Sequence, residues 1–461
     1  MKFSPAVLHG HLAPLIGDTE PVMLVIALSG GADSAALADA AATLARTERR
    51  LGVRALHVDH GLGAGAAPLR GAAIALADAL GLPLRILAVE VDPAAPGGLE
   101  AAARAARYGA LEAALAPAEC LLTAHHLEDQ AETLLLQLLR GAGLRGLAAM
   151  PSAAPFGSGR LLRPLLGVPR ATLRAYAQAR GLAHHEDPMN ADPRFDRAYL
   201  RHELWPRLTH RWPQAALTVA RSASHIAAAQ RLLDEHSAEL IAALEAGPAL
   251  SVEALLALPA GRRGELLRAW LARQGLSAPP ARRQARIEAE LLRARGAGLP
   301  RMAWAGAELR TFAGFLYAFA PLERLRLAGR ALPGPGEAAL PLGELGALGR
   351  LEVSATTGAG LKWPAPGAPY TITARTGGER LRLRPDAPRR ALKDLLREAR
   401  LPPWARERAI LIEGSTLAAV VLPHATWIAA EHAAGPGEAG VGLLWRGAPA
   451  ALLPAPARRV H

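Results

Sequence analysis

Through residue 180, short apolar runs of strand length alternate with longer Ala- and Leu-rich runs of helix length. The runs expected to form strands are residues 22–28, 53–58, 82–91, 119–123 and 160–167. The runs expected to form helices are residues 35–44, 66–80, 99–115, 129–139 and 168–180. Alternation at this spacing predicts an α/β fold with a doubly wound parallel sheet.

The pattern changes further along the chain. Apolar residues recur every three or four positions through 212–292, which predicts helices, whereas 302–322 has the pattern of strands. A Pro- and Gly-rich stretch at 333–341 precedes 351–427, whose mixed pattern predicts a small mixed α/β domain. We therefore expect a sheet domain at 1–211, a mainly helical domain at 212–330, a linker at 331–350 and a C-terminal domain at 351–461.

The junction between the first expected strand and its helix has the composition of an anion-binding loop. Its residues are Ser29, Gly30, Gly31, Ala32, Asp33 and Ser34. The glycines let backbone N–H groups turn toward one point, and the start of the helix adds partial positive charge. The loop lacks both the Walker and the dinucleotide-binding patterns. An ordinary strand–turn–helix connection is the alternative interpretation.

A second polar segment, TAHHLEDQAET at 123–133, follows the fourth expected strand. Asp129 and Glu132 are three positions apart and so share one helix face, while His125 lies in the preceding turn. Paired carboxylates close to a phosphate site are typical of Mg²⁺, which prefers oxygen ligands. Acidic residues that only stabilise a helix N-terminus are the alternative.

Two arginines occupy one face of the third expected helix. Arg104 and Arg107 are three positions apart and close to Tyr108. The planar guanidinium group suits phosphate and carboxylate recognition because it binds through two parallel hydrogen bonds. A solvated helix face explains the same spacing, so the pair is only a candidate binding site.

Composition narrows the classes of function. The single cysteine, Cys120, excludes an internal disulfide framework and any Cys-x-x-Cys metal site. No signal peptide and no uncharged apolar run of membrane-spanning length is visible, so we expect a cytoplasmic protein without membrane association. The net charge of +12 suits a polyanionic partner, although arginine bias from a GC-rich genome explains it equally well.

Further motifs follow the anion-binding loop in a fixed order. They are HVDHGLG at 57–63, EAAARAARY at 100–108, TAHHLEDQAET at 123–133, LLRGAGLRGLAAM at 138–150, RPLL at 163–166, DPMNADPRFDRAYLRHELWP at 187–206 and the basic segment 375–408. Together they resemble the tRNA(Ile)-lysidine synthetase family of PP-loop ATP pyrophosphatases. The resemblance implies that ATP adenylates the first anticodon cytidine of tRNA(Ile) with a CAU anticodon. Free L-lysine then displaces AMP.

The resemblance also implies roles for individual residues. The loop from Ser29 to Ser34 would bind ATP, and Asp33 and Asp129 would hold Mg²⁺. The residues implied in catalysis are Asp33, Arg107, His125, Asp129, Glu132 and Arg197. Asp129 and Glu132 are both candidates for the base that deprotonates lysine. The implied tRNA-binding residues are Arg389, Arg390 and Lys393.

The sequence departs from the family pattern at three positions, with Glu128 for Asp, Met189 for Ser and Ala198 for Asn. Another PP-loop enzyme, such as a tRNA thiolase or an amide-forming synthetase, is one alternative function. A tRNA-binding protein with a vestigial loop is another. The sequence leaves the oligomeric state open, a homodimer included.

Overall fold

The structure is a computed structural model of the chain. It describes residues 2–17, 20–61, 65–92, 98–186, 196–294, 300–325, 327, 329–343, 346–364 and 369–454. The chain divides into two compact units, Met1–Leu233 and Asp234–His461, which are treated separately below. No helix in the described part of the chain is both long enough and apolar enough to span a membrane.

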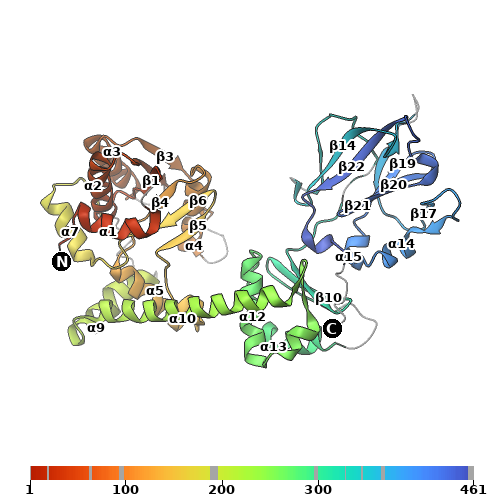
Figure 1. The fold of residues 1–461 in the computed structure, drawn as a ribbon. Coiled ribbons are helices and arrows are strands. Elements are labelled where there is room, and N and C mark those ends of the chain that lie inside the picture. The colour runs from red at the N-terminus through yellow and green to blue at the C-terminus, as the bar shows by residue number, and fades with distance from the viewer. Residues whose placement is uncertain are drawn as a thin grey trace. The chain divides into compact units, whose positions relative to one another are not determined.

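The N-terminal unit alternates helices and strands, as Figure 1 shows. Its strands are β1 (Val22–Ala27), β2 (Leu51–Asp59), β3 (Leu84–Ala88), β4 (Cys120–Leu122), β5 (Ala153–Phe156) and β6 (Gly159–Leu162). Its helices are α1 (Pro5–Ile16), α2 (Ala32–Thr47), α3 (Ala66–Leu80), α4 (Gly98–Ala113), α5 (Leu127–Leu139), α6 (Leu144–Leu147), α7 (Arg170–Ala179), α8 (Asp196–Tyr199) and α9 (Trp205–Arg211). Helix α10 (Ala215–Leu244) begins in this unit and ends in the next.

The six strands form one sheet in the order β3-β2-β1-β4-β6-β5. All neighbours are parallel except β5, which pairs antiparallel with β6. The chain proceeds outward from β1 to β3 and then returns to the other side of β1 with β4. The expected doubly wound α/β fold is therefore confirmed. The strand order reverses between β1 and β4, which is where open α/β sheets bind ligands.

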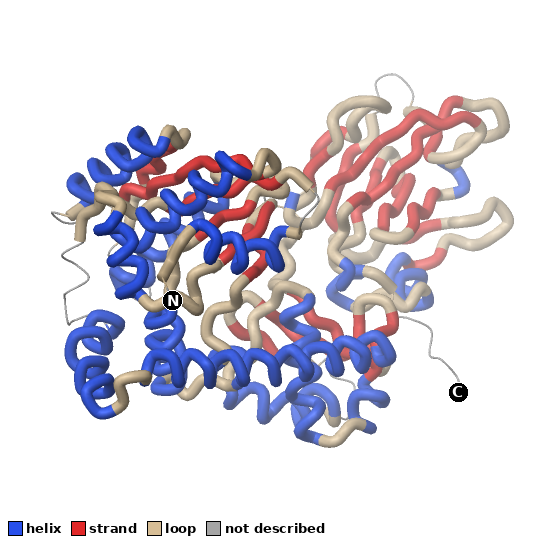
Figure 2. Tube along the Cα trace, turned by 60° about the vertical axis from the view of Figure 1, so that its left-hand side comes forward, coloured by secondary structure: helices blue, strands red, loops and turns tan. Residues whose placement is uncertain are grey.

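Both faces of this sheet are covered by helices, as Figures 1 and 2 show. Leu24 and Ile26 of β1 pack on one side with the alanine-rich helix α2. Val25 faces the opposite side and packs with Leu111 of α4. Successive strand residues point to opposite faces, so a continuous apolar strand satisfies both layers at once. The central strands consequently form a rigid support for the loops at their ends.

A buried polar contact fixes α7 on α2. Asp39 of α2 has an exposed fraction of only 1%. Its carboxylate accepts a 2.6 Å hydrogen bond from the hydroxyl of Tyr176 and two 3.1 Å hydrogen bonds from Arg180. Leu173 and Ala177 add buried apolar contacts on the same side of α7. The start of α7 is thereby held at a defined place relative to the helix that follows the anion-binding loop.

The second unit begins with helices and an antiparallel sheet. Its helices are α11 (Val252–Ala257), α12 (Ala260–Arg273) and α13 (Ala281–Ile287), followed by a π-helical turn, η3 (Glu288–Leu292). The sheet has the order β7-β8-β11-β10-β9 and consists of β7 (Glu245–Ala246), β8 (Ala249–Ser251), β9 (Arg301–Trp304), β10 (Ala307–Phe312) and β11 (Phe315–Phe319). Strands expected within 302–322 are thus present, but β7 and β8 lie inside the stretch that the pattern assigned to helices.

The C-terminal part of this unit is dominated by antiparallel strands. One sheet has the order β12-β16-β19-β20-β21, with β12 (Arg330–Ala331), β16 (Thr371–Ala374), β19 (Ile410–Glu413), β20 (Leu417–Leu422) and β21 (Ala425–Ile428). A second has the order β13-β14-β22-β15, with β13 (Leu340–Pro341), β14 (Arg350–Thr357), β15 (Leu361–Lys362) and β22 (Ala439–Arg446). The remaining elements are β17 (Arg380–Leu381), β18 (Arg390–Ala391), α14 (Leu392–Glu398), α15 (Pro403–Arg406) and two 3₁₀ turns, Ala430–His432 and Ala450–Leu452.

The prediction of a linker at 331–350 is wrong. Within this stretch β13 pairs with β14, and Leu342 and Leu348 are buried in the C-terminal core. At least one glycine of this stretch serves tight packing. Gly349 has a φ of +86°, and a Cβ there would lie 2.2 Å from the carbonyl oxygen of Arg446. Glycine is therefore required for the close approach of two strand ends.

Candidate active site

The anion-binding loop connects β1 to α2 at the carboxyl edge of the sheet. Gly30 has a φ of +87°, and a Cβ there would lie 2.3 Å from the carbonyl oxygen of Leu69. Ser34 donates to the carbonyl oxygen of Gly31 over 2.9 Å, and its hydroxyl lies 3.0 Å from that of Ser29. Because helix α2 begins at Ala32, the N–H groups of its first turn have no hydrogen-bond partners within the helix. The sequence therefore builds an anion site from backbone donors.

The segment after β4 supplies the opposing charges. The N–H of His126 donates to Asp129 Oδ2 over 3.0 Å, which caps α5. The ring of His126 is buried, and its Nε2 lies 3.4 Å from Asp129 Oδ2 and 3.7 Å from Asp33 Oδ2. Its Nδ1 lies 3.1 Å from Glu128 Oε2. One imidazole thus sits among three carboxylates from two neighbouring strand ends.

These contacts determine the pKa values of the cluster. Burial lowers the pKa of His126, but Glu128, Asp129 and Asp33 outweigh that effect and raise it above its usual value. Burial raises the pKa of Asp33, although His126 and Arg170 oppose that shift. Burial also acts to raise the pKa of Asp129, yet the neighbouring histidines lower it overall. We therefore expect Asp129 to be ionised at neutral pH.

His125 behaves differently from its neighbour. One ring nitrogen, Nδ1, lies 2.8 Å from the hydroxyl of Thr123. Burial lowers the pKa of His125 to about 3, and the nearby Arg163 adds to that shift. The ring is consequently neutral at physiological pH. A neutral imidazole at this position can accept or donate a hydrogen bond without adding charge.

Glu132 lies behind Asp129 and is almost completely buried. Both of its carboxylate oxygens accept 2.8 Å hydrogen bonds from Arg201, which also donates to Asp129 Oδ1 over 3.3 Å. Arg201 belongs to a π-helical turn, η2 (Leu200–Leu204). Such turns occur frequently at functional sites. Glu132 therefore holds Arg201, which in turn holds Asp129.

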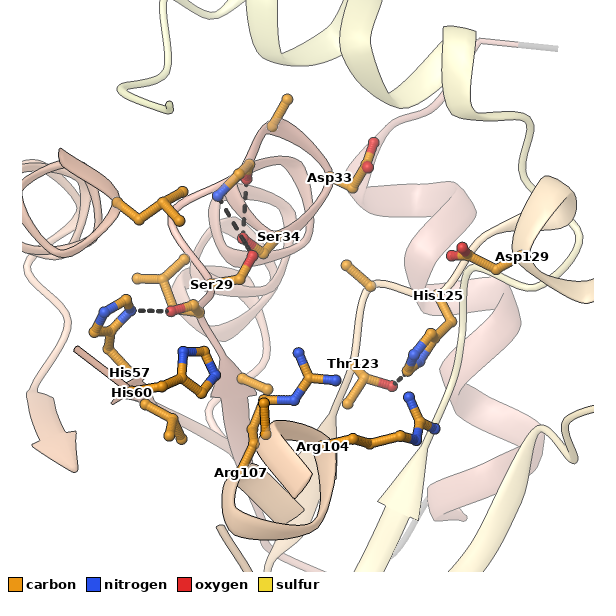
Figure 3. Close-up of a pocket in the computed structure, with 18 of the residues that line it drawn as sticks. Ser29, Asp33, Ser34, His57, His60, Arg104, Arg107, Thr123, His125 and Asp129 are labelled. Carbon is orange, nitrogen blue, oxygen red and sulfur yellow. Dashed lines mark hydrogen bonds between the residues drawn. The ribbon is translucent and has the colours of Figure 1, made fainter. Parts of the chain in front are cut away.

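The remaining expected arginines come from α4 and α8. Arg104 stacks on Tyr108 at 4.8 Å from the ring centroid, and Arg107 lies 5.6 Å from the same centroid. Burial lowers the pKa of Arg107. Arg197 donates to the hydroxyl of Thr133 over 2.7 Å. Figure 3 shows Arg104 below His125, and Arg107 between Thr123 and His60.

A cavity of about 650 Å³ joins these groups. The catalytic residues expected from the sequence that line it are Asp33, Arg107, His125, Asp129 and Arg197, together with the loop residues Ser29, Gly31, Ala32 and Ser34. Gly30 and Glu132 are not among its lining residues. Other lining residues are His57, Arg104, Arg170, Arg174, Arg201 and His202. The cavity is therefore lined both by the loop between β1 and α2 and by several arginines.

Sequence reasoning missed Arg170, Arg174 and Arg201. Arg170 and Arg174 have i, i+4 spacing on an expected helix, which indicates a shared face but not what that face meets. Arg201 follows Arg197 by four positions in the quoted motif. Its link to Glu132 spans 69 positions and has no local signal.

Two departures from the family pattern fall in this region. Glu128 Oε2 accepts a 2.9 Å hydrogen bond from the N–H of Arg170 besides its contact with His126. The longer side chain is thus used to join α5 to the start of α7. Ala198 lines the cavity, so an amide at this position would have faced the bound ligands. Met189 lies outside the described residues.

The carboxylates differ in their capacity to hold a cation. Asp33 Oδ1 is buried without a hydrogen-bond partner, whereas both oxygens of Asp129 already accept hydrogen bonds. Magnesium commonly takes one or two carboxylates together with phosphate oxygens. The described residues contain no group of three or more potential side-chain ligands arranged around a metal. Asp33 therefore fits Mg²⁺ bound jointly with a polyphosphate better than Asp129 does.

The expected tRNA-binding residues lie on the surface of the second unit. Arg389 donates to Glu431 over 2.6 Å, and Arg390 pairs with Glu398. Lys393 is exposed on α14 and has no ion pair within the described part of the chain. The two arginines are thus partly neutralised in the protein alone.

Three family models match successive parts of the chain. They are a PP-loop domain at residues 7–208, a TilS substrate binding domain at 250–317 and a TilS substrate C-terminal domain at 370–445. Proteins named tRNA(Ile)-lysidine synthase are similar over most of the length. The relative from Methylococcus capsulatus is 40% identical, and the match covers 91% of this chain and 95% of the relative.

Two other relatives agree. The tRNA(Ile)-lysidine synthase from Pseudomonas aeruginosa is 43% identical, covering 84% of this chain and 86% of the relative. That from Ralstonia nicotianae is 42% identical with the same coverage. This chain belongs to the tRNA(Ile)-lysidine synthase family. The PP-loop domain of the family spans residues 7–208, which include the loop from Ser29 to Ser34, called the PP-loop below, and all residues that line the cavity.

The buried state of His125 predicts a pH dependence of stability. Its pKa is about 3 in the folded protein and 6.5 in the reference state. Between these values the unfolded chain binds a proton that the folded chain does not, so lowering the pH destabilises the fold. Between about pH 6.5 and pH 3 the wild type should lose up to about 1.4 kcal/mol more per pH unit than His125→Gln.

Urea titrations at a series of pH values measure this difference. Replacement of the exposed His184 by Gln is the matched control and should leave the wild-type slope unchanged. Parallel curves for wild type and His125→Gln would show that His125 is not held neutral.

Proposed function

We propose that this protein attaches lysine to the first anticodon cytidine of tRNA(Ile) with a CAU anticodon, using ATP and Mg²⁺. The observation that carries the proposal is the convergence of the PP-loop, the α5 carboxylates and three segments bearing arginines on one cavity. Membership of the tRNA(Ile)-lysidine synthase family supports it. The cavity volume of about 650 Å³ suits a nucleotide together with a reacting base.

In the first step, cytidine O2 attacks the α-phosphorus of ATP. The bond from that phosphorus to the bridging oxygen breaks, and pyrophosphate leaves with the electron pair. The backbone donors of the PP-loop and nearby arginines stabilise the negative charge that develops on the phosphates. Bound Mg²⁺, held by Asp33, would add positive charge at the same place.

In the second step, the lysine side-chain amine attacks C2 of the adenylated cytidine. The C2–O2 bond breaks, and AMP leaves with that oxygen. The attacking ammonium must first lose a proton. We assign its binding and deprotonation to Asp129, because that carboxylate lines the cavity whereas Glu132 does not.

A lysine-transfer assay tests this function. Purified protein, ATP, Mg²⁺, labelled lysine and unmodified tRNA(Ile) are combined, and the digested RNA is analysed for a lysine-bearing cytidine. Asp129→Asn should lower transfer by roughly 10²- to 10⁴-fold, because a general base is lost. Glu132→Gln should lower it less, because it weakens only the support of Arg201. Asp78→Asn on the exposed side of α3 is the control.

The outcomes separate the alternatives. ATP consumption without lysine transfer would indicate a different nucleophile or acceptor. A folded protein that neither consumes ATP nor transfers lysine would support a tRNA-binding role with a vestigial loop. A larger loss in Glu132→Gln than in Asp129→Asn would reverse the assignment of the base.

The C-terminal part has a separate predicted role. Residues 375–408 carry eleven basic against five acidic residues, which suits phosphate contacts away from the reaction. Replacing Arg389, Arg390 and Lys393 by Ala together should weaken tRNA binding by roughly tenfold or more and reduce its salt dependence. ATP affinity should not change.

Filter-binding measurements over a salt series test this role, with Lys362→Ala as the control. Lys362 is paired with Glu438 in the same unit. Equal losses of tRNA and ATP binding would contradict the separation of tRNA selection from catalysis.

A further inference from the structure

Helix α7 presents two arginines to the PP-loop end of the cavity. Arg170 and Arg174 are four positions apart, so they share one face of the helix, and both line the cavity. Arg170 Nε lies 3.6 Å from Asp33 Oδ2, and the charge of Arg174 also acts on Asp33. Arg174 Nη2 contacts Glu186 at 2.5 Å. Two guanidinium groups therefore line the cavity near Asp33.

The contact between Arg170 and Asp33 leaves hydrogen-bonding capacity unused. Asp33 Oδ1 and Arg170 Nε are both buried without a hydrogen-bond partner. Buried polar atoms normally have partners, because each unsatisfied group costs free energy. An unpaired donor on Arg170 and an unpaired acceptor on Asp33 suggest that a ligand supplies partners for both, an acceptor for the arginine and a cation for the carboxylate. A magnesium–polyphosphate complex offers both an oxygen for Arg170 and a cation for Asp33.

The position of α7 does not depend on the ligand. Asp39 anchors Tyr176 and Arg180 to α2, and Glu128 accepts from the N–H of Arg170 at the start of α7. The N–H of His185 donates to the carbonyl oxygen of Gly30 over 2.8 Å, which ties the segment after α7 to the loop. The two arginines are thus held on a support that is linked to the PP-loop itself. Such preorganised charges need little rearrangement during a reaction.

We propose that Arg170 and Arg174 bind the β- and γ-phosphates of ATP and stabilise the departing pyrophosphate. The inference rests on the ATP-dependent function proposed above and assigns two further residues to it. As the bond between the α-phosphorus and the bridging oxygen breaks, the electron pair and its charge move onto pyrophosphate. Arginines beside that group lower the barrier because the charge they meet increases toward the transition state.

The location of Arg170 and Arg174 favours pyrophosphate over two other anions in the reaction, the carboxylate of lysine and a phosphate of the anticodon loop. Arg170 is next to Asp33 at the PP-loop, where a polyphosphate belongs. Arg104 lies instead beside His125 and Thr123, and Arg107 lies between Thr123 and His60 (Figure 3). That second pair is placed for the carboxylate of lysine or a phosphate of the anticodon loop. Each pair of arginines is consequently assigned a different anion, the polyphosphate for the pair on α7 and one of the other two anions for the pair on α4.

Equilibrium binding of AMP, ATP and pyrophosphate tests the assignment. Isothermal titration calorimetry, with Mg²⁺ present, compares wild type with Arg170→Ala, Arg174→Ala and Arg170→Lys. We expect Arg170→Ala to weaken ATP and pyrophosphate binding at least tenfold while AMP binding changes less than twofold. Arg174→Ala should show a smaller loss of the same kind, and Arg170→Lys should recover part of it. Arg85→Ala, at an exposed position on β3, is the matched arginine control.

AMP binding is also the check that each variant is folded. Equal losses of AMP, ATP and pyrophosphate in Arg170→Ala, with no recovery in Arg170→Lys, would overturn the inference in favour of a structural role. Loss of lysine or tRNA binding with unchanged pyrophosphate binding would overturn it in favour of another anion. Wild-type protein that binds neither ATP nor pyrophosphate would overturn both the inference and the proposed function.

Discussion

The parallel pairing of β1 with β4 is the constraint on which the active site depends. It places the ends of two strands side by side at the point where the strand order reverses. The PP-loop follows one strand, and the segment with His125 and Asp129 follows the other. Their juxtaposition places Asp33 of the PP-loop 3.7 Å from the ring of His126, which lies 3.4 Å from Asp129.

This juxtaposition places several carboxylates close together, and neighbouring cationic side chains offset their negative charge. Asp33, Glu128, Asp129 and Glu132 are wholly or largely enclosed, and unpaired buried carboxylates are costly. His126 lies among three of them, while Arg201 neutralises Glu132 and also contacts Asp129. Arg170 adds a further positive charge at Asp33. These three groups thus offset most of the charge of the four carboxylates without ligands, but Asp33 and Arg170 retain unused hydrogen-bonding capacity.

The sequence predicted the parts of this arrangement that depend on local pattern. Alternating strands and helices fixed the sheet, and a sheet of this kind gathers its loops at one edge, so Asp33, His125 and Asp129 could be expected together. Glu132 could not be separated from Asp129, because its partner Arg201 comes from a distant π-helical turn. The linker prediction failed because glycines that permit close strand contacts, such as Gly349, resemble flexible linker residues in composition.

The central claim is that ATP activates the cytidine by forming a bond to its O2 atom. The most direct measurement follows that oxygen through the reaction, using tRNA labelled with ¹⁸O at O2 of the first anticodon cytidine. The account predicts that the label leaves the RNA and appears in the released AMP, because lysine displaces AMP together with O2. Label that remains in the RNA, or appears in pyrophosphate, would contradict the adenylated cytidine intermediate.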